Sequence, residues 1–340
     1  MHTVKHGTSP LAFTRRAFTL GACTAALVAA AAATTFPAAA QSDWPNRTVT
    51  VIVPFPPGGN TDTQARLLSE HLSKKFGQSF IVDNRPNAGG TIATAQLAKS
   101  KPDGYTLMFG SAGQTTILPM VQKVSYDAEK ELMPLSIFGT GPFILGAKND
   151  LPAKTMKDLI AYAKANPGKL NIATPNPGSI SHLSATLFAK RAGIDLVQVP
   201  YKGGGPAIAA LLGGEVDLYF GNASELLQYS TGGRLRLMAV SSPEPLKQIP
   251  DVPPVAATFP GFKTSSWNGL IGPAGLPKDV AEKLVNATIE ASKQPAIVER
   301  LTTLGVQPTG STMKEFTDIV AAERPLYREA VDAAGLKMQN

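Results

Sequence analysis

The stretch Val49–Asp62, which reads VTVIVPFPPGGNTD, contains the pattern that decides the fold. Val49–Val53 is an apolar, β-branched run of strand length, and a turn of prolines and glycines follows it at once. Thr61 and Gln64 then have the spacing of a capping box, and apolar residues recur at helical spacing as far as Phe76. We therefore predict a strand, a Gly-rich loop and a helix, with backbone N–H groups at the helix start placed to bind an anion.

This unit of strand, loop and helix recurs along the chain. Further short strands that run into loops of Gly, Ser, Asn and Pro are predicted at Phe80–Asp83, Tyr105–Phe109, Leu170–Ala173, Leu196–Val199 and Val216–Phe220. Repeated units of this kind are typical of α/β folds with doubly wound parallel sheets. The C-terminal part reads as helices at Asp279–Lys293, Ala296–Leu304, Met313–Ala322 and Pro325–Ala334.

The pattern restarts near Phe138–Lys148, after a Gly- and Pro-containing stretch, which indicates two α/β lobes. We assign residues 41–140 together with 260–340 to the first lobe, and residues 141–259, with the connecting strands, to the second. In open α/β sheets ligands bind beyond the carboxyl ends of the strands, where both lobes place their Gly- and Ser-containing loops. The two sets of loops are therefore predicted to face one another across a cleft.

Residues 1–40 have the features of a cleaved export signal. Arg15 and Arg16 form a twin arginine, Leu20–Ala33 is a weakly hydrophobic run, and Ala38–Ala40 offers a cleavage site before Gln41. The twin arginine favours the Tat route, with Sec export as the alternative. The apolar run is shorter than the ~20 residues that a membrane span needs. We expect a periplasmic protein.

Composition excludes several classes of function. Cys23, the single cysteine, lies in a segment that could be read as a lipoprotein box, but the apolar run follows it instead of preceding it. Cleavage after Ala40 would remove this cysteine, and with it any disulfide or thiol chemistry. Loss of Lys5, Arg15 and Arg16 with the leader would lower the formal net charge from +7 to +4. No Lys/Arg run indicates nucleic-acid binding.

The inventory of reactive side chains is equally sparse. Only His71 and His182 remain among the histidines after residue 40, and no HExxH, CxxC, GxSxG or P-loop motif occurs. Nucleophilic and metal catalysis are therefore disfavoured, and no cofactor or metal is expected. A mechanism based on two carboxylates stays open, because a sequence does not show which acids meet in space.

At this point the motifs become specific to a family. Pro54–Asp62 resembles the P-F-x-P-G-G-x-x-D signature of Bug-type periplasmic receptors, which serve tripartite tricarboxylate transporters. The similarity continues in order through Asn84–Gly90, Pro102–Leu107, Ser179–Leu183, Val199–Ala207, Gly233–Arg236, Ile249–Pro253 and Trp267–Leu270. It departs at Asn87 and Pro254, where the family usually has Gly and Thr, and Thr174–Ser179 is richer in proline than usual.

The resemblance implies a two-lobed type II periplasmic-binding fold that closes on a small carboxylate, which is a dicarboxylate, tricarboxylate, acidic amino acid or aromatic acid. In such receptors the P-F-x-P-G-G-x-x-D loop helps to hold one carboxylate, largely through backbone amides and ordered water. The expected partners are therefore this ligand and the integral-membrane subunits of a transporter, and the receptor is expected to be a monomer. An input to a signalling partner is an alternative, as is a carboxylate-dependent hydrolase or isomerase.

Loop position and resemblance together nominate a set of ligand-binding residues. Asp62 is interpreted as an acid that fixes the first loop, and Arg85 as either a counter-ion of the ligand or an ion-pair partner of Asp83. His182 is interpreted as a hydrogen-bonding or packing residue near the pocket, and no residue is predicted to be catalytic. The full set is Phe55, Pro57, Gly58, Gly59, Asp62, Arg85, Gly89, Gly90, Ser111, Thr115, Thr174, Ser179, Ser181, His182, Tyr201, Gly203, Gly204 and Asn222.

Overall fold

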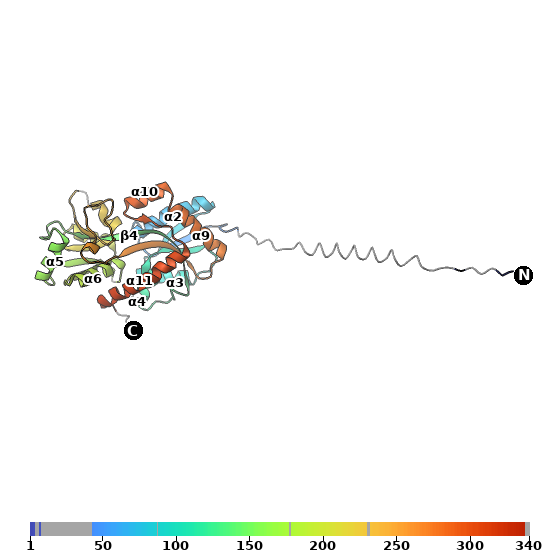
Figure 1. The fold of residues 1–340 in the computed structure, drawn as a ribbon, viewed down its shortest axis with the longest axis horizontal. Helices are drawn as coiled ribbons and strands as arrows, with labels where there is room; N and C mark the ends of the chain where they lie inside the picture. The colour runs from blue at the N-terminus through green and yellow to red at the C-terminus, as the bar shows by residue number, and fades with distance from the viewer. Residues whose placement is uncertain (4–6, 8–42, 87, 177, 230–231, 337–340) are drawn as a thin grey trace. The chain divides into compact units, whose positions relative to one another are not determined.

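The computed structural model describes residues 1–3, 7, 43–86, 88–176, 178–229 and 232–336. Residues from Trp44 onward form one compact unit of mixed α and β structure (Figure 1). The predicted twin arginine, the cleavage site and Cys23 lie outside the described residues, as does Asn87. Among the described residues, no helix is long and apolar enough to cross a membrane.

The strands are hydrogen-bonded in the order β2-β1-β3-β9-β4-β7-β5-β6, and β8 and β10 pair with β4 outside this path. β1 pairs in parallel with β2 and β3, and β5 pairs in parallel with β6 and β7. The bounds are β1 (Val49–Val53), β2 (Phe80–Asn84), β3 (Thr106–Gly110), β4 (Leu132–Ala147), β5 (Asn171–Pro175), β6 (Val197–Tyr201), β7 (Leu218–Asn222), β8 (Arg236–Val240), β9 (Ser265–Pro273) and β10 (Gln307–Pro308). The α/β class with parallel units is therefore confirmed.

The long strand β4 joins the two groups of parallel strands. Its residues Leu132–Pro142 pair with β9, and Phe143–Ala147 pair with β7. The sequence predicted only a restart near Phe138–Lys148 and missed the first part of this strand. The reason is local: Pro134 and Pro142 lower strand propensity, while antiparallel pairing with β9, more than a hundred residues later, stabilises the strand.

The helices cover both faces of the sheets and enclose three clusters of buried apolar residues. α2 packs on α9, and one cluster lies between these helices and β1 and β3 (Figure 1). A second cluster lies under α7 and α8 in the other half. The bounds are α2 (Asn60–Phe76), α3 (Thr91–Ala98), α4 (Leu118–Val121), α5 (Met156–Ala165), α6 (Ile180–Ala192), α7 (Gly204–Leu212), α8 (Ala223–Leu226), α9 (Lys278–Ala291), α10 (Pro295–Thr303) and α11 (Met313–Ala333), with a π-helix at Gly113–Ile117 and short 3-10 turns at Ala88–Gly90, Leu227–Tyr229 and Val255–Ala257.

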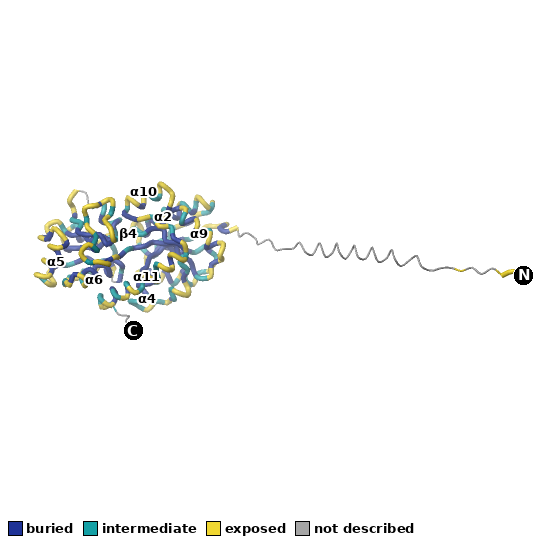
Figure 2. Tube along the Cα trace, in the orientation of Figure 1, coloured by how far each residue is buried: buried dark blue, intermediate teal, exposed yellow. Residues whose placement is uncertain are grey.

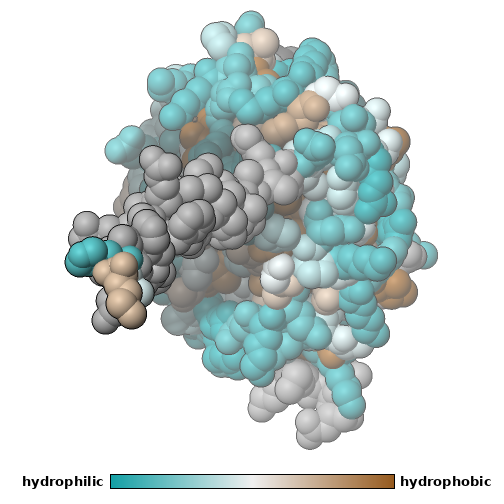
Figure 3. All heavy atoms as spheres, turned by 90° about the vertical axis from the view of Figure 1, so that its right-hand side faces the viewer, coloured by the Kyte–Doolittle hydropathy of each residue, from teal (hydrophilic) through white to brown (hydrophobic). Residues whose placement is uncertain are grey.

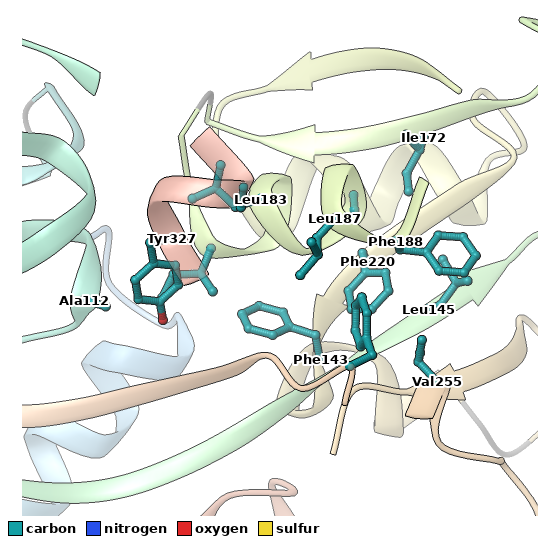
Figure 4. Close-up of a cluster of buried hydrophobic side chains, with 14 of the residues drawn as sticks. Ala112, Phe143, Leu145, Ile172, Leu183, Leu187, Phe188, Phe220, Val255 and Tyr327 are labelled. Carbon is teal, nitrogen blue, oxygen red and sulfur yellow. The ribbon is translucent and has the colours of Figure 1, made fainter. Parts of the chain in front are cut away.

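The third and largest cluster extends from one group of strands to the other. It contains Ala112, Phe143, Phe220 and Tyr327, which belong to segments far apart in the sequence (Figure 4). The rings of Phe143 and Phe188 lie 6.4 and 6.3 Å from that of Phe220, centroid to centroid. Buried positions follow the strands, whereas α5 and α10 expose much of their surface (Figure 2).

The C-terminal helix differs from its prediction. Pro325 was expected to separate two helices, Met313–Ala322 and Pro325–Ala334, but α11 continues through it as a single helix. A proline inside a helix removes one hydrogen bond. Phe316 and Tyr327, on either side of Pro325, are both buried, and their packing holds the two segments in line.

Candidate ligand-binding site

The predicted capping box at the start of α2 is wrong. The helix begins at Asn60 with Gly59 as its N-cap, and no side chain caps it. The Thr61 hydroxyl donates instead to Asn268 Oδ1 at 2.7 Å, and Gln64 Nε2 donates to Asn60 Oδ1 at 3.0 Å. Within the described part of the chain, no protein acceptor receives a hydrogen bond from the amides of residues 59–62. These donors sit beside the exposed Pro57, Gly58 and Gly59.

Asp62 fixes this loop from inside. Its carboxylate is buried and accepts hydrogen bonds from the Gly58 amide at 2.9 Å, Asn84 Nδ2 at 2.9 Å and Arg66 Nε at 3.0 Å. Burial alone would raise the pKa of Asp62, but these hydrogen bonds and the Arg66 charge outweigh it and hold the pKa below its usual value. Asp62 therefore shapes the loop while its own oxygens are already occupied.

Arg85 and Phe55 are also engaged with the protein. The Arg85 guanidinium pairs with Asp83 at 2.5 Å, one of the two interpretations given above, and it also donates to Gln96. Phe55 is half-buried against the apolar cluster beneath α2, and its carbonyl accepts from Asn84 Nδ2 at 3.1 Å. The structure thus places Phe55 in the first loop and turns Arg85 toward β2 and α3.

Gln114 joins the loops that follow β2 and β3. Its Nε2 donates to the Gly89 carbonyl at 3.0 Å, and its Oε1 accepts from the Ser111 amide at 3.1 Å. Gly90 has φ +98°, and a Cβ there would lie 2.7 Å from Pro54 Cβ and 2.9 Å from Gln114 Nε2. The sequence did not single out Gln114, whose role depends on contacts between two loops.

The Ser111 and Thr115 hydroxyls are buried, in contrast to the exposed Gly58 and Gly59. Ser111 Oγ lies 3.3 Å from Gln114 Oε1, and Thr115 Oγ1 lies 3.3 Å from Thr116 Oγ1. Thr115 also lines a cavity of about 370 Å³ between the π-helix and α11. Of the predicted site residues, Thr115 alone lines this cavity, and the loop with Gly58 and Gly59 does not.

In the second half, the loops after β5 and β6 meet. The amide of Asn176, which has φ +54°, donates to the Tyr201 carbonyl at 2.9 Å, and Thr174 Oγ1 donates to the Val199 carbonyl at 3.3 Å. Ser179 is the N-cap of α6, with its hydroxyl accepting from the His182 amide at 3.2 Å. These predicted residues therefore lie around one end of the second group of strands.

His182 and Ser181 bind the backbone of the same region. His182 Nδ1 accepts the Gly178 amide at 2.9 Å, so the neutral ring carries its proton on Nε2. Burial lowers the pKa of His182, which favours this neutral form. Ser181 Oγ donates to the Phe220 carbonyl, two residues before Asn222. Both residues stabilise the loops through structural hydrogen bonds.

Glu225, which the sequence analysis missed, lies against the loop after β6 that contains Gly203 and Gly204. Its Oε2 accepts from the Tyr219 hydroxyl at 2.7 Å and from the Asn222 amide at 3.2 Å. A Cβ on Gly204 would lie 2.3 Å from Glu225 Oε1, whereas one on Gly205 would meet nothing within 4 Å. Gly204 is thus needed for close approach of a carboxyl group, and Gly203 for its φ of +105°.

The two sets of loops point toward each other along β4. β3 ends at Gly110, which pairs with Gly269 of β9, and Gly269 in turn pairs with Ile137 of β4. β7 runs in the opposite direction and ends at Asn222, which pairs with Phe143 of β4. The carboxyl ends therefore approach one another six residues apart on β4, or about 20 Å at ~3.3 Å per residue. A Cβ on Gly178, in the loop after β5, would lie 3.4 Å from Val121 of α4, so segments that follow β5 and β3 come close to each other.

The site offers hydrogen-bond donors and little reactive chemistry. In the part of the chain that the structure describes, no three His, Cys, Asp or Glu side chains gather closely enough to hold a metal ion. The start of α2 presents backbone amides, whereas the hydroxyls of Ser179 and Ser181 are already hydrogen-bonded within the protein. The carboxyl groups of Asp62 and Glu225 belong to different loops and make separate hydrogen bonds. This arrangement is suited to binding a small polar molecule.

Comparison with known proteins identifies the family. The family described as "Tripartite tricarboxylate transporter family receptor", TctC, matches residues 64–336. The chain belongs to the TctC family. It is 34% identical to Protein BugT of Bordetella pertussis over 319 residues, which cover 93% of this chain and 95% of BugT. The resemblance to Bug-type receptors is therefore confirmed.

Solved structures of TctC-type proteins share the fold. Rpa4515 of R. palustris with adipate is 32% identical with a TM-score of 0.82, and covers 87% of this chain and 99% of its own. The periplasmic binding protein BugD is 32% identical, with a TM-score of 0.79, and the match covers 87% of this chain and 100% of BugD. MatC of Rhodopseudomonas palustris with bound malate is 32% identical, with a TM-score of 0.77, and the match covers 85% of this chain and 100% of MatC. The chain is thus a solute-binding receptor with the periplasmic-binding fold.

Proposed function

We propose that this TctC receptor captures a small organic carboxylate between its two lobes, residues 41–140 with 260–340 and residues 141–259. It then delivers the ligand, as a monomer, to the integral-membrane subunits of a tripartite tricarboxylate-type transporter. The chain acts by binding and release and catalyses no reaction. Export to the periplasm and cleavage near Ala40 complete the proposal.

One observation carries it: the start of α2 has free amide donors and an acid turned inward. Asp62 accepts the Gly58 amide and Arg66, so its charge is compensated inside the loop. The amides of residues 59–62 have no protein acceptor in the described residues. A helix N-terminus with such amides and the positive end of its dipole favours a carboxylate.

The class of ligand is supported by the neighbours. Rpa4515 and MatC are described with adipate and malate, which are both dicarboxylic acids. In this chain the approaching strand ends leave about 20 Å along β4 for the loops and a ligand. A dicarboxylate is therefore the first class to test, followed by tricarboxylates and aromatic acids.

The direct experiment is a thermal-shift screen of the leaderless protein, followed by isothermal titration calorimetry. The panel contains mono-, di- and tricarboxylates, acidic amino acids and aromatic acids, with uncharged sugars as controls. A ligand at a hundredfold excess over its Kd should stabilise the fold by about 2.7 kcal/mol. A saturable shift with one acid, recovered unchanged, is the expected result. Shifts with sugars alone would contradict the carboxylate class, as would product formation.

The export part of the proposal has its own test. Expression of the full chain, followed by N-terminal sequencing of the protein in the periplasmic fraction, should give a mature chain that begins at Gln41. Replacement of Arg15 and Arg16 by lysine should block export if the Tat route is used. Unimpaired export of that variant would favour the Sec route.

A further inference from the structure

The cavity of about 370 Å³ beside α11 plays no part in the proposed capture of a ligand at the start of α2. The π-helix and α4 line it on one side, α11 on another, and residues 126–129 on a third. Cavities that bind small molecules measure roughly 300–1,000 Å³, so a small molecule fits here. We propose that this cavity is a second binding site, for an organic anion with one negative charge and an apolar body.

The charges that line the cavity leave one positive charge over. The charged lining residues are Asp127, Glu129, Arg324 and Arg328. Glu129 forms an ion pair with Arg324, and Asp127 forms one with Lys130 at 2.9 Å. Among the residues that the structure describes, Arg328 forms neither an ion pair nor a hydrogen bond with another side chain. Its guanidinium is therefore available to a ligand.

The acids on the same helix do not take up Arg328. Glu329 lies closest to Lys190, at 3.5 Å, and to Arg191, at 3.9 Å, which both belong to α6. Asp332 follows Arg328 by one turn, and an exposed pair at this spacing contributes only about 0.3–0.5 kcal/mol. A bound carboxylate can offer the guanidinium two parallel hydrogen bonds instead.

Thr115 and Thr116 supply a buried hydrogen-bond donor to the same cavity. Their side chains are 6% and 3% exposed, and their Oγ1 atoms lie 3.3 Å apart. A hydrogen bond between the two hydroxyls uses one of their protons, so the other proton lacks an acceptor in the described part of the chain. The Tyr126 hydroxyl donates to the Gln114 carbonyl at 2.7 Å, which holds this side of the cavity in place.

These features select a class of ligand. One unpaired guanidinium and a free hydroxyl proton match one carboxylate, and the apolar body can pack on Pro119, Met120 and Ala128, which also line the cavity. The second carboxylate of a diacid would meet Asp127 and Glu129, which repel it. This site should therefore prefer monocarboxylates, in contrast to the dicarboxylates that are the first class to test at α2.

NMR of the leaderless protein with isotope-labelled methionine methyl groups tests the site, with benzoate as the probe. The Met120 signal, assigned through Met120→Leu, reports on the cavity, and Met238, buried in β8, is the reference. Benzoate should shift the Met120 signal to saturation and leave that of Met238 unchanged. Benzamide has the same shape without the charge, and terephthalate adds a second carboxylate. Both should bind at least about tenfold more weakly, as expected when a charged hydrogen bond is lost or opposed.

Arg328→Gln is the decisive variant, because it removes the unpaired charge from an exposed position on α11. It should weaken benzoate binding by at least about tenfold. The matched control, Arg300→Gln, changes an exposed arginine on α10 that does not line the cavity and should leave the Kd unchanged. Thermal unfolding of both variants reports whether the fold is retained.

Four outcomes overturn the second site. They are a Met120 signal that does not respond to benzoate, an equal response to benzamide, an unchanged Kd in Arg328→Gln, and loss of the response when the best carboxylate of the thermal-shift screen is present at saturation. The last result would show that benzoate acts from the site at α2. Failure of every carboxylate in that screen would overturn the proposed function and leave the benzoate titration as a separate result.

Discussion

Asp62 and Glu225 show how neighbours decide the role of a carboxyl group. Both follow a Gly-containing loop or strand end, and both are hydrogen-bonded to a backbone amide. Asp62 also has Arg66, whereas Glu225 has only the Tyr219 hydroxyl and Asn222. The Asp62 carboxylate is therefore compensated by a cation, whereas the Glu225 carboxyl group, the N3 partner of Asn222 in the α8 capping box, has neutral donors only.

Replacing Asp62 by asparagine should destabilise the protein. The amide cannot accept all three bonds from Gly58, Asn84 and Arg66, and its NH₂ group would face a donor. We expect a loss of about 2 kcal/mol at pH 7 in urea unfolding, the magnitude of a buried charge-assisted hydrogen bond. Asp318→Asn removes an exposed ion pair as a control and should cost under ~0.5 kcal/mol. Equal losses would contradict the role given to Asp62.

The pH dependence of this difference follows from the lowered pKa of Asp62. Because the folded pKa lies below the ordinary aspartate value of 3.8, the stabilisation is complete above that value. It is lost as the pH falls through the folded pKa. The difference between wild type and Asp62→Asn should therefore be constant from pH 8 to pH 5 and shrink only below about pH 4.

At the scale of elements, the loops after β1, β2 and β3 meet at Gly90. Gly90 contacts Pro54 and Gln114 in a backbone conformation that side chains rarely adopt, with φ +98°. Gly77, the C-cap of α2, also has a positive φ of 66°, but a Cβ there would meet nothing within 4 Å. Substitution of Gly77 would therefore cause backbone strain alone, whereas substitution of Gly90 would cause backbone strain and a steric clash.

Gly90→Ala should cost more stability than Gly77→Ala. The second variant bears the left-handed backbone alone, at about 1 kcal/mol, whereas the first also forces Pro54 and Gln114 apart. We expect a loss above ~2 kcal/mol for Gly90→Ala in urea unfolding, together with weaker ligand binding because the three loops shift. Similar losses for both variants, with unchanged binding, would show that the contact is unimportant.

Local patterns predicted the elements well and their partners poorly. Val49–Val53 forms the strand that its β-branched run indicated. Thr61, however, bonds to Asn268, 207 residues away, instead of capping its own helix. Gln114 was missed for the same reason, because its role depends on loops brought together by the fold. Glu225 differs, since it forms a local capping box with Asn222, three residues earlier. The positions of the ligand-contacting residues stay a prediction.

At the scale of the whole molecule, α11 and β9 connect the halves. Trp267 of β9 donates to Glu323 Oε2 at 2.9 Å, and the Tyr327 hydroxyl donates to the same oxygen at 3.2 Å. α11 also packs on α6 and α4, beside the large cluster that includes Ala112 and Phe220 (Figure 4).

The face of the molecule that Figure 3 shows is mostly hydrophilic, with hydrophobic residues scattered over it. Apolar packing is thus concentrated inside.

Glu323→Gln should reveal the cost of burying this carboxyl group. Burial raises the pKa of Glu323 above the ordinary glutamate value of 4.5, despite hydrogen bonds from Trp267 and Tyr327. A raised folded pKa gives stability that is present below pH 4.5 and is lost as the pH rises through the folded value. Relative to Glu323→Gln, the wild-type protein should therefore lose stability between pH 4.5 and pH 8. A difference that is independent of pH would contradict this.

Replacement of Gly59 tests most directly whether the free amides at the start of α2 hold the ligand carboxylate. The φ of Gly59, −76°, suits proline, so Gly59→Pro removes one amide donor with little strain. The control Gly59→Ala keeps this donor, and its Cβ would lie 3.7 Å from the nearest atom, the Pro56 carbonyl oxygen. For the best carboxylate in the screen, calorimetry should show about tenfold weaker binding or more for Gly59→Pro, near-wild-type binding for Gly59→Ala, and similar unfolding of both. Equal affinity of all three proteins would contradict the account.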